Sequence, residues 1–185
     1  MWLPDFSLRA LQPVLALMLA SLTAACFQPL YGERAIGGGS ALRDSLAAVD
    51  VAQIEAPKGT PLARIAVETR NELNFDLTGG SGSAPPTHRL TVRLIRTGTT
   101  IVLDPITLRN EFDNFGLDAY FTLTEVASGK NVLTGNTTTR VTYNVPGQEQ
   151  RFARTRALRD AETRASKMIA DQIRSRLASY FVAGT

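Results

Sequence analysis

The last fifth of the chain carries one apolar stripe that runs for more than six helical turns. In residues 151–181 the apolar side chains recur at steps of three and four, which is the period of an α-helix with one buried face. The stripe consists of Leu158, Ala161, Ala165, Met168 or Ile169, Ile173, Leu177, and Tyr180 or Phe181. The remaining surface of this helix carries eight basic residues against three acidic ones. A helix with a single apolar stripe needs a second layer of structure to cover that stripe.

A shorter strand and a second helix are predicted upstream. Residues 49–54 alternate apolar and polar side chains, which is the period of a half-buried strand. Thr60 supplies a capping hydroxyl, and Pro61 fits the first turn of a helix, where its missing N–H costs nothing. We therefore expect a helix from Pro61 to about Phe75, with Ile65 and Leu73 on its buried face.

Three further strands are expected in the middle of the chain. Residues 88–95 place Leu90, Val92 and Leu94 on one face, and residues 100–103 continue this strand after a kink. Residues 120–126 and 132–145 are rich in threonine and β-branched residues and flank a turn at residues 127–130, which predicts a hairpin. The acids Asp104, Glu111 and Asp113 are expected in a solvated loop before the hairpin.

The order of these elements predicts an α+β fold. The economical arrangement is a four-stranded mixed or antiparallel sheet with two helices packed on one face. The other face of the sheet, rich in threonine and arginine, is then left to solvent or to a partner.

The residue inventory excludes several chemistries. The chain has one histidine and one cysteine, which leaves no intrachain disulfide, no Cys/His zinc cluster and no catalytic Cys-His dyad. His88, which opens a strand, has no second histidine or cysteine with which to share a metal. The net charge of +3 is far below that of a dedicated nucleic-acid binder. We therefore expect no metal, no nucleic-acid partner and no enzymatic activity.

The lone cysteine follows an uncharged, mainly apolar run. Residues 10–25 are 16 residues long, which suits a signal-peptide core better than a membrane span of roughly 20 residues. The run ends in Leu22-Thr23-Ala24-Ala25-Cys26, with small residues at the two positions before the cysteine.

This junction resembles the lipobox of bacterial lipoproteins, although Thr23 stands where the pattern usually has leucine. The resemblance implies that Cys26 carries a diacylglycerol thioether, and that its new amino group is acylated with a fatty acid such as palmitate after the signal peptide is cut. The chain then divides into a signal peptide at residues 1–25, a lipidated tether at residues 26–48, which includes Gly37-Gly38-Gly39-Ser40, and a single domain at residues 49–185. The covalent lipid is the only attached group expected, with no other cofactor.

The residues after Cys26, Phe27-Gln28-Pro29-Leu30-Tyr31-Gly32, resemble the start of the mature chain in the LptE family of LPS-assembly lipoproteins, in its alphaproteobacterial form. That family usually has a glycine directly after the cysteine, which is absent here. The resemblance continues through residues 61–73, 120–126, 128–130 and 170–173, and so spans most of the mature chain.

Membership of this family implies an outer-membrane lipoprotein that acts without catalysis. It implies a role as the plug and assembly partner of the LptD β-barrel, and binding of lipopolysaccharide (LPS) during its insertion into the outer leaflet. Arg109, Arg151 and Arg154 roughly match family positions that contribute basic contacts to LPS. Phe27 after the cysteine, in place of the aspartate that retains some lipoproteins at the inner membrane, agrees with outer-membrane sorting.

Two other classes of function remain open at the level of sequence. An accessory lipoprotein of a phospholipid transport system, of the ABC or MCE type, can share a small fold of one sheet and covering helices. A lipid-modifying enzyme is a third class, which the inventory of titratable side chains disfavours.

Overall fold

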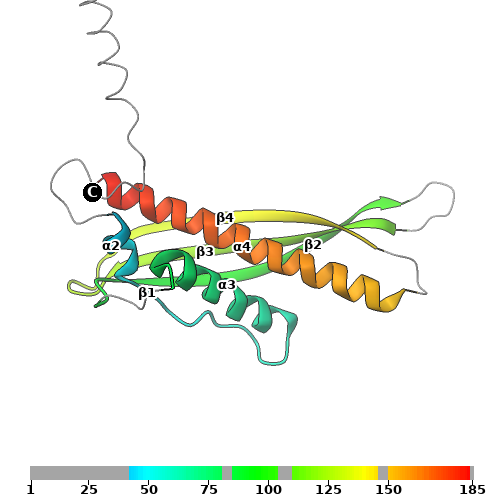
Figure 1. The fold of residues 1–185 in the computed structure, drawn as a ribbon, viewed down its shortest axis with the longest axis horizontal. Coiled ribbons are helices and arrows are strands. Elements are labelled where there is room, and N and C mark those ends of the chain that lie inside the picture. Colours follow the sequence, from blue (N-terminus) through cyan, green and yellow to red (C-terminus); the bar gives the residue numbers. More distant parts are fainter. Residues whose placement is uncertain (1–41, 81–84, 104–109, 146–149, 184–185) are drawn as a thin grey trace, which may run out of the picture.

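The computed structural model of the chain describes residues 42–80, 85–103, 110–145 and 150–183. Cys26 and Arg109 therefore lie outside the described residues. The elements follow in the order α2 (Leu42–Ala47), β1 (Val49–Val51), α3 (Pro61–Thr78), β2 (His88–Leu103), β3 (Asn110–Glu125), β4 (Asn131–Asn144) and α4 (Arg151–Ala183). This order confirms the predicted α+β class (Figure 1).

The four strands form one mixed sheet in the order β1-β2-β3-β4. The short strand β1 pairs in parallel with the start of β2, and the two other pairs are antiparallel. The strands β2, β3 and β4 are 16, 16 and 14 residues long, which makes the sheet much longer than it is wide. The 33-residue helix α4 spans about 50 Å at 1.5 Å per residue, and its buried residues run from Ala161 to Ala178.

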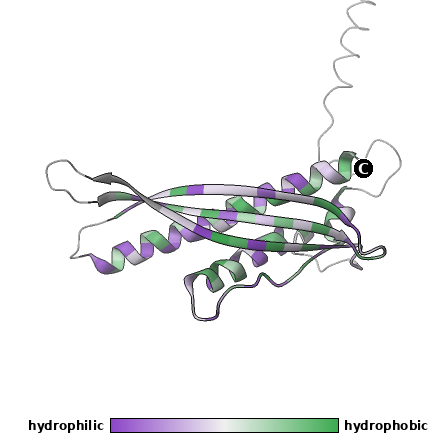
Figure 2. Ribbon diagram, turned by 180° about the vertical axis from the view of Figure 1, so that it is seen from behind, coloured by the Kyte–Doolittle hydropathy of each residue, from purple (hydrophilic) through white to green (hydrophobic). Residues whose placement is uncertain are grey.

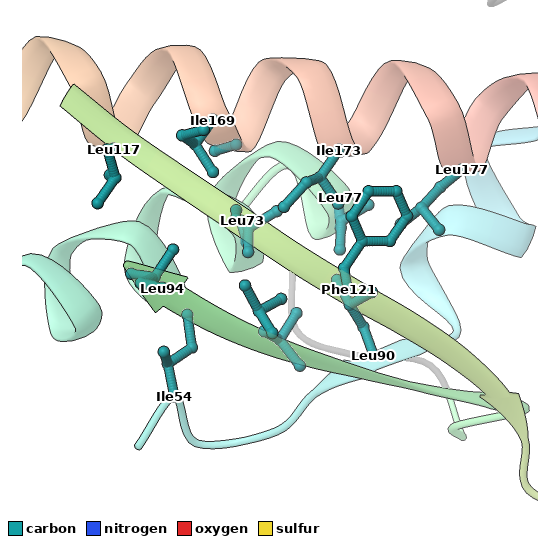
Figure 3. Packing of buried hydrophobic residues seen from close by; sticks show 14 of the residues in the cluster. Ile54, Leu73, Leu77, Leu90, Leu94, Leu117, Phe121, Ile169, Ile173 and Leu177 are labelled. Carbon is teal, nitrogen blue, oxygen red and sulfur yellow. The ribbon is translucent and has the colours of Figure 1, made fainter. Parts of the chain in front are cut away.

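The helices cover one face of this sheet. Helix α4 lies along β3 and β4, and α3 lies beside α4 (Figure 1). The core fills the space between these layers, with Leu90, Phe121, Leu73 and Ile173 among the residues that are almost fully buried (Figure 3). Ile169 rather than Met168 takes the core position of the α4 stripe, since Met168 is 43% exposed.

The predicted limits of α3 follow from its caps. The side chain of Thr60 accepts a hydrogen bond from the Ala63 N–H at 3.3 Å, and Pro61 opens the first turn. The helix ends at Gly79, which adopts the left-handed conformation at φ 64° and donates its N–H to the Phe75 carbonyl at 2.8 Å. Glycine adopts this conformation without the steric cost that a Cβ atom brings.

Strand β3 is longer than the sequence predicted. It begins at Asn110 rather than at Tyr120, so Glu111 and Asp113 stand on a strand and not in a solvated loop. The alternation was present, because Phe115, Leu117 and Ala119 are buried at every second position. The polar residues and Gly116 between them hid the pattern, since glycine and aspartate are disfavoured in strands.

The folded domain also begins earlier than the sequence indicated. The range assigned to the tether, residues 26–48, includes helix α2, and both Leu42 and Leu46 are buried in the common core. The strand expected over residues 49–54 is shorter than predicted, because β1 stops at Val51 and only half of it forms. The domain boundary therefore lies at or before Leu42.

The face of the sheet away from the helices, which is turned towards the viewer in Figure 2, carries polar side chains on alternate residues, as the sequence predicted. Its side chains come from alternate residues of the strands, among them Arg93, Thr122, Thr134, Thr138 and Arg140. Arg140 forms an ion pair with Asp118 at 2.7 Å on this face. Within the ranges that the structure describes, no helix is both long enough and apolar enough to cross a membrane.

Candidate basic site at the distal pole

The elongated domain has two different poles. At one pole, which we call the tether pole, α2 begins, the β3–β4 turn closes and α4 ends (Figure 1). At the other, which we call the distal pole, β2 ends, β3 begins, β4 ends and α4 begins. Leu42, the first described residue, and Arg151, the first residue of α4, therefore lie at opposite ends of the molecule.

The start of α4 projects from the distal pole as a basic segment. Residues 151–156 are all exposed, and residues 151–160 contain four arginines and one acid, Asp160. Cations at a helix N-terminus oppose the helix dipole, which favours negative charge there. These arginines therefore do not serve the stability of the helix, and they leave the segment suited to a negatively charged ligand.

Arg154 joins this segment to the sheet. Its Nη2 lies 3.8 Å from Oδ2 of Asp113 on β3, and the same oxygen accepts a hydrogen bond from the Tyr143 hydroxyl of β4 at 3.4 Å. The side chain of Asp113 is 15% exposed, whereas that of Arg154 is 57% exposed. A contact of this length with an exposed guanidinium is weak, so Arg154 can turn to an anionic ligand at little cost.

The pKa of the Tyr143 hydroxyl depends on burial and on the charge of Asp113. Burial raises the pKa of the Tyr143 hydroxyl above its ordinary value of 10.0, and the negative charge of Asp113 raises this pKa further. The tyrosine therefore stays protonated at neutral pH and acts as a hydrogen-bond donor. A tyrosine in this state can orient the carboxylate of Asp113 but does not act as a base.

A small pocket lies beside this cluster. It has a volume of about 200 Å³ and is lined by Arg96, Thr97, Gly98, Asp113, Asn114, Phe115 and Tyr143. The guanidinium of Arg96 lies 5.6 Å from the centre of the Phe115 ring. The sequence prediction missed Arg96, although a signal was present: it stands where the alternation of Leu90, Val92 and Leu94 calls for another buried apolar residue.

Two of the three basic residues predicted for the site lie within the described residues. Arg151 and Arg154 both lie at the distal pole and both are exposed. Phe152 between them is 91% exposed, which puts an apolar side chain among the cations. Arg109 lies outside the described residues, and Asn110, the next residue, opens β3 at the same pole.

The ring of His88 contacts Phe181 and Thr87. Its ring packs edge-on against Phe181, with ring centres 5.2 Å apart, and its Nδ1 lies 2.9 Å from the Thr87 hydroxyl. Among the described residues no group of three or more histidine, cysteine, aspartate or glutamate side chains is placed to hold a metal ion.

Two solved structures of bacterial lipoproteins share this fold. A putative lipoprotein from Caulobacter crescentus matches with a TM-score of 0.59 and 21% identity, over 78% of this chain and 97% of that one. The rare lipoprotein B from Shewanella oneidensis matches with a TM-score of 0.51 and 17% identity, over 73% and 96% of the two chains. No protein-family model and no curated protein sequence matches the chain. At these identities the likeness establishes the fold alone.

Proposed function

We propose that this protein is an outer-membrane lipoprotein, anchored by acyl chains on Cys26, that belongs to the LPS translocon. Its role is to plug and help assemble the LptD β-barrel and to bind LPS as it is inserted into the outer leaflet. The role requires no catalysis and no cofactor beyond the covalent lipid. The sequence motif around Cys26 and the fold shared with two bacterial lipoproteins support this proposal.

The observation that carries the proposal is the position of the basic segment. The described chain begins at one pole, and the arginines at the start of α4 lie at the other, a distance set by a helix of about 50 Å. A domain held by a lipid at the tether pole therefore presents Arg151 and Arg154 away from its anchor. Guanidinium groups bind phosphates and carboxylates with paired N–H donors, and LPS carries both groups.

The polar face of the sheet supports the second part of the proposal. The lumen of a transmembrane barrel is lined by polar side chains, so a plug needs polar groups that can pair with them. The uncovered face supplies hydroxyls from residues such as Thr122, Thr134 and Thr138 and a guanidinium from Arg93. An apolar face would leave the polar groups of the lumen unpaired, at a cost for each.

The ligand is tested by charge reversal at the distal pole. We expect Arg151→Glu/Arg154→Glu to weaken LPS binding by at least about tenfold in a direct titration, because two attractive charges become repulsive. The matched control is Arg43→Glu/Lys130→Glu, which makes the same change in net charge at the tether pole on two exposed side chains. Equal binding by the two variants would remove Arg151 and Arg154 from the site.

The anchor and the partner are tested on the native protein. Mass spectrometry should find Cys26 as an acylated N-terminus, and a bare thiol there contradicts the lipoprotein assignment. Purification from detergent-solubilised outer membranes should recover a very large β-barrel. Recovery of an ABC transporter or a lipid-shuttle complex instead would move the protein to the phospholipid transport class.

A further inference from the structure

The outer edge of β4 is long and almost uncharged. In the sheet order β1-β2-β3-β4, β4 pairs with β3 on one side and with no described strand on the other. It has 14 residues, of which only Arg140 is charged, and it contains no proline. Proteins usually protect such edges with charges, prolines or short strands. The edge of β4 therefore remains open to pairing with another strand.

The opposite edge of the sheet differs. There β1 covers only the start of β2, and the exposed part of β2 carries Arg93 and Arg96, with Arg89 just before them. Charged side chains along an edge disfavour an incoming strand. Among the described strands, the edge of β4 therefore carries less charge than the edge of β2, with one arginine against two.

The hydrogen-bonding pattern identifies the groups that point outward from β4. The Val126 N–H donates to the Thr87 carbonyl, towards β2, and the Glu125 N–H donates to the Lys130 carbonyl, towards β4, both at 2.9 Å. Because successive residues of a strand point to opposite sides, the odd-numbered residues of β3 bond to β4. The register pairs them with odd-numbered residues of β4. The even-numbered residues then direct N–H and C=O away from the sheet, and these are Thr134, Asn136, Thr138, Arg140 and Thr142.

A pocket lies at the start of this edge, between β4 and α4. It has a volume of about 530 Å³ and is lined by Leu133, Ser175, Arg176, Ser179 and Tyr180. Its polar groups are one guanidinium and three hydroxyls, and none of its side chains is acidic. In strand addition, main-chain hydrogen bonds provide affinity and pockets for alternate side chains provide specificity. This pocket has the chemistry to receive a carboxylate.

The composition of β4 argues against a second copy of the chain as the occupant. A second copy paired edge to edge would bring its own β4, which contains no acidic residue. It would therefore place no carboxylate in the pocket beside Arg176, whereas an acidic strand would meet this arginine favourably.

We infer that the outer edge of β4 accepts an extended segment of a different polypeptide as a fifth strand, with an acidic side chain of that segment seated in the pocket beside Arg176. The edge amides of Thr134 to Thr142 bind its main chain, and Arg176 selects an acidic sequence over a basic one. This surface is separate from the arginines at the start of α4, so it does not depend on LPS binding.

The test uses a blocked, fluorescent peptide as long as β4 in which glutamate and threonine alternate, and a second peptide with lysine in place of glutamate. We expect the acidic peptide to bind, the lysine peptide to bind at least about tenfold more weakly, and hydrogen exchange to slow at the outward amides of β4. Failure of the acidic peptide to bind, or equal binding of both peptides, overturns the inference.

Two substitutions locate the binding. Thr138→Pro removes an outward N–H at an edge, where proline is tolerated, and should abolish binding, whereas Thr138→Val keeps the N–H and should not. Arg176→Glu should weaken binding by about tenfold, whereas Arg159→Glu, on the flank of α4 that faces α3, should have little effect.

Misfolding of the proline variant and dimerisation of the free protein are the two outcomes still to be covered. If Thr138→Pro does not fold by circular dichroism, Thr138→Lys replaces it, because an exposed lysine on an edge also blocks pairing. Unchanged binding in a folded edge variant contradicts the inference. Dimerisation of the free protein in sedimentation equilibrium that is lost in the edge variant assigns the edge to a second copy, and this also overturns it.

Discussion

The ion pair between Arg64 and Glu162 provides a stability test of how α3 and α4 are joined. Glu162 is on α4 and its side chain is 1% exposed, whereas the side chain of Arg64 on α3 is 49% exposed. Arg64 Nη2 donates to Glu162 Oε2, and Oε1 has no hydrogen-bond partner among the described residues. The carboxylate therefore depends on a single guanidinium that reaches it from the surface.

Removing that guanidinium leaves a buried charge without a partner. Breaking a buried pair by deleting one member costs about 3 to 5 kcal/mol. Because Arg64 is half exposed, water already screens part of the interaction, and we expect Arg64→Ala to lose about 2 to 3 kcal/mol. In a chain of this size that loss lowers the Tm by roughly 4 to 12 °C.

The double-mutant cycle separates this effect from ordinary loss of packing. Glu162→Gln removes the charge at nearly constant volume, so it should cost only about 1 kcal/mol. With the charge gone, deletion of Arg64 matters little, and Arg64→Ala/Glu162→Gln should be more stable than Arg64→Ala alone. Urea unfolding followed by circular dichroism measures all four proteins, with Arg159→Ala as a surface control that changes stability by less than about 0.5 kcal/mol.

Two results would refute this reasoning. One is a loss of less than about 1 kcal/mol for Arg64→Ala, which would mean that solvent reaches Glu162. The other is strict additivity of the two single variants, which would mean that the pair does not interact.

Three further predictions concern single residues. Burial, followed by the charge of Asp171, raises the pKa of Asp76 above 3.8, so ionised Asp76 destabilises the fold at neutral pH. Asp76→Asn should therefore raise the Tm at pH 7, and this gain should vanish as the pH falls towards 4. A hydrogen bond from Arg140 lowers the pKa of Asp118 below 3.8. Ionised Asp118 therefore stabilises the fold above that pH, and this stabilisation is lost as the pH falls through the lowered pKa. In urea unfolding at a series of pH values, Asp118→Asn should lose less stability than the wild type as the pH falls. Gly135→Ala would place a Cβ 2.7 Å from Cζ of Phe121 and should cost about 1 to 3 kcal/mol in the same assay.

The elements in which apolar residues repeat regularly, or in which capping residues mark the ends, were predictable from the sequence. The stripe of α4, the caps of α3 and the alternation at Leu90, Val92 and Leu94 each depend on residues close together in the chain. Such patterns are local, and the fold class followed from their order. The predicted polar face of the sheet has the same origin, because alternation fixes which side chains share a face.

Elements whose pattern is interrupted needed the tertiary structure. The first half of β3 contains Gly116 and several polar residues, and it becomes a strand because β2 and β4 pair with it on both sides. Helix α2 is only six residues long, too short to be stable alone, and it forms because Leu42 and Leu46 are buried by α3 and α4.

The sequence by itself determined which residues are apolar, basic or conformationally special, and through their spacing it determined the helices, most of the strands and the basic character of the start of α4. Only the tertiary structure decided that Asp113 meets both Arg154 and Tyr143, that Arg64 reaches the buried Glu162, and that no described strand pairs with the outer edge of β4. The first two features join residues that are between 30 and 98 positions apart. Strand register and helix packing are set by the core as a whole, so no local pattern contains them.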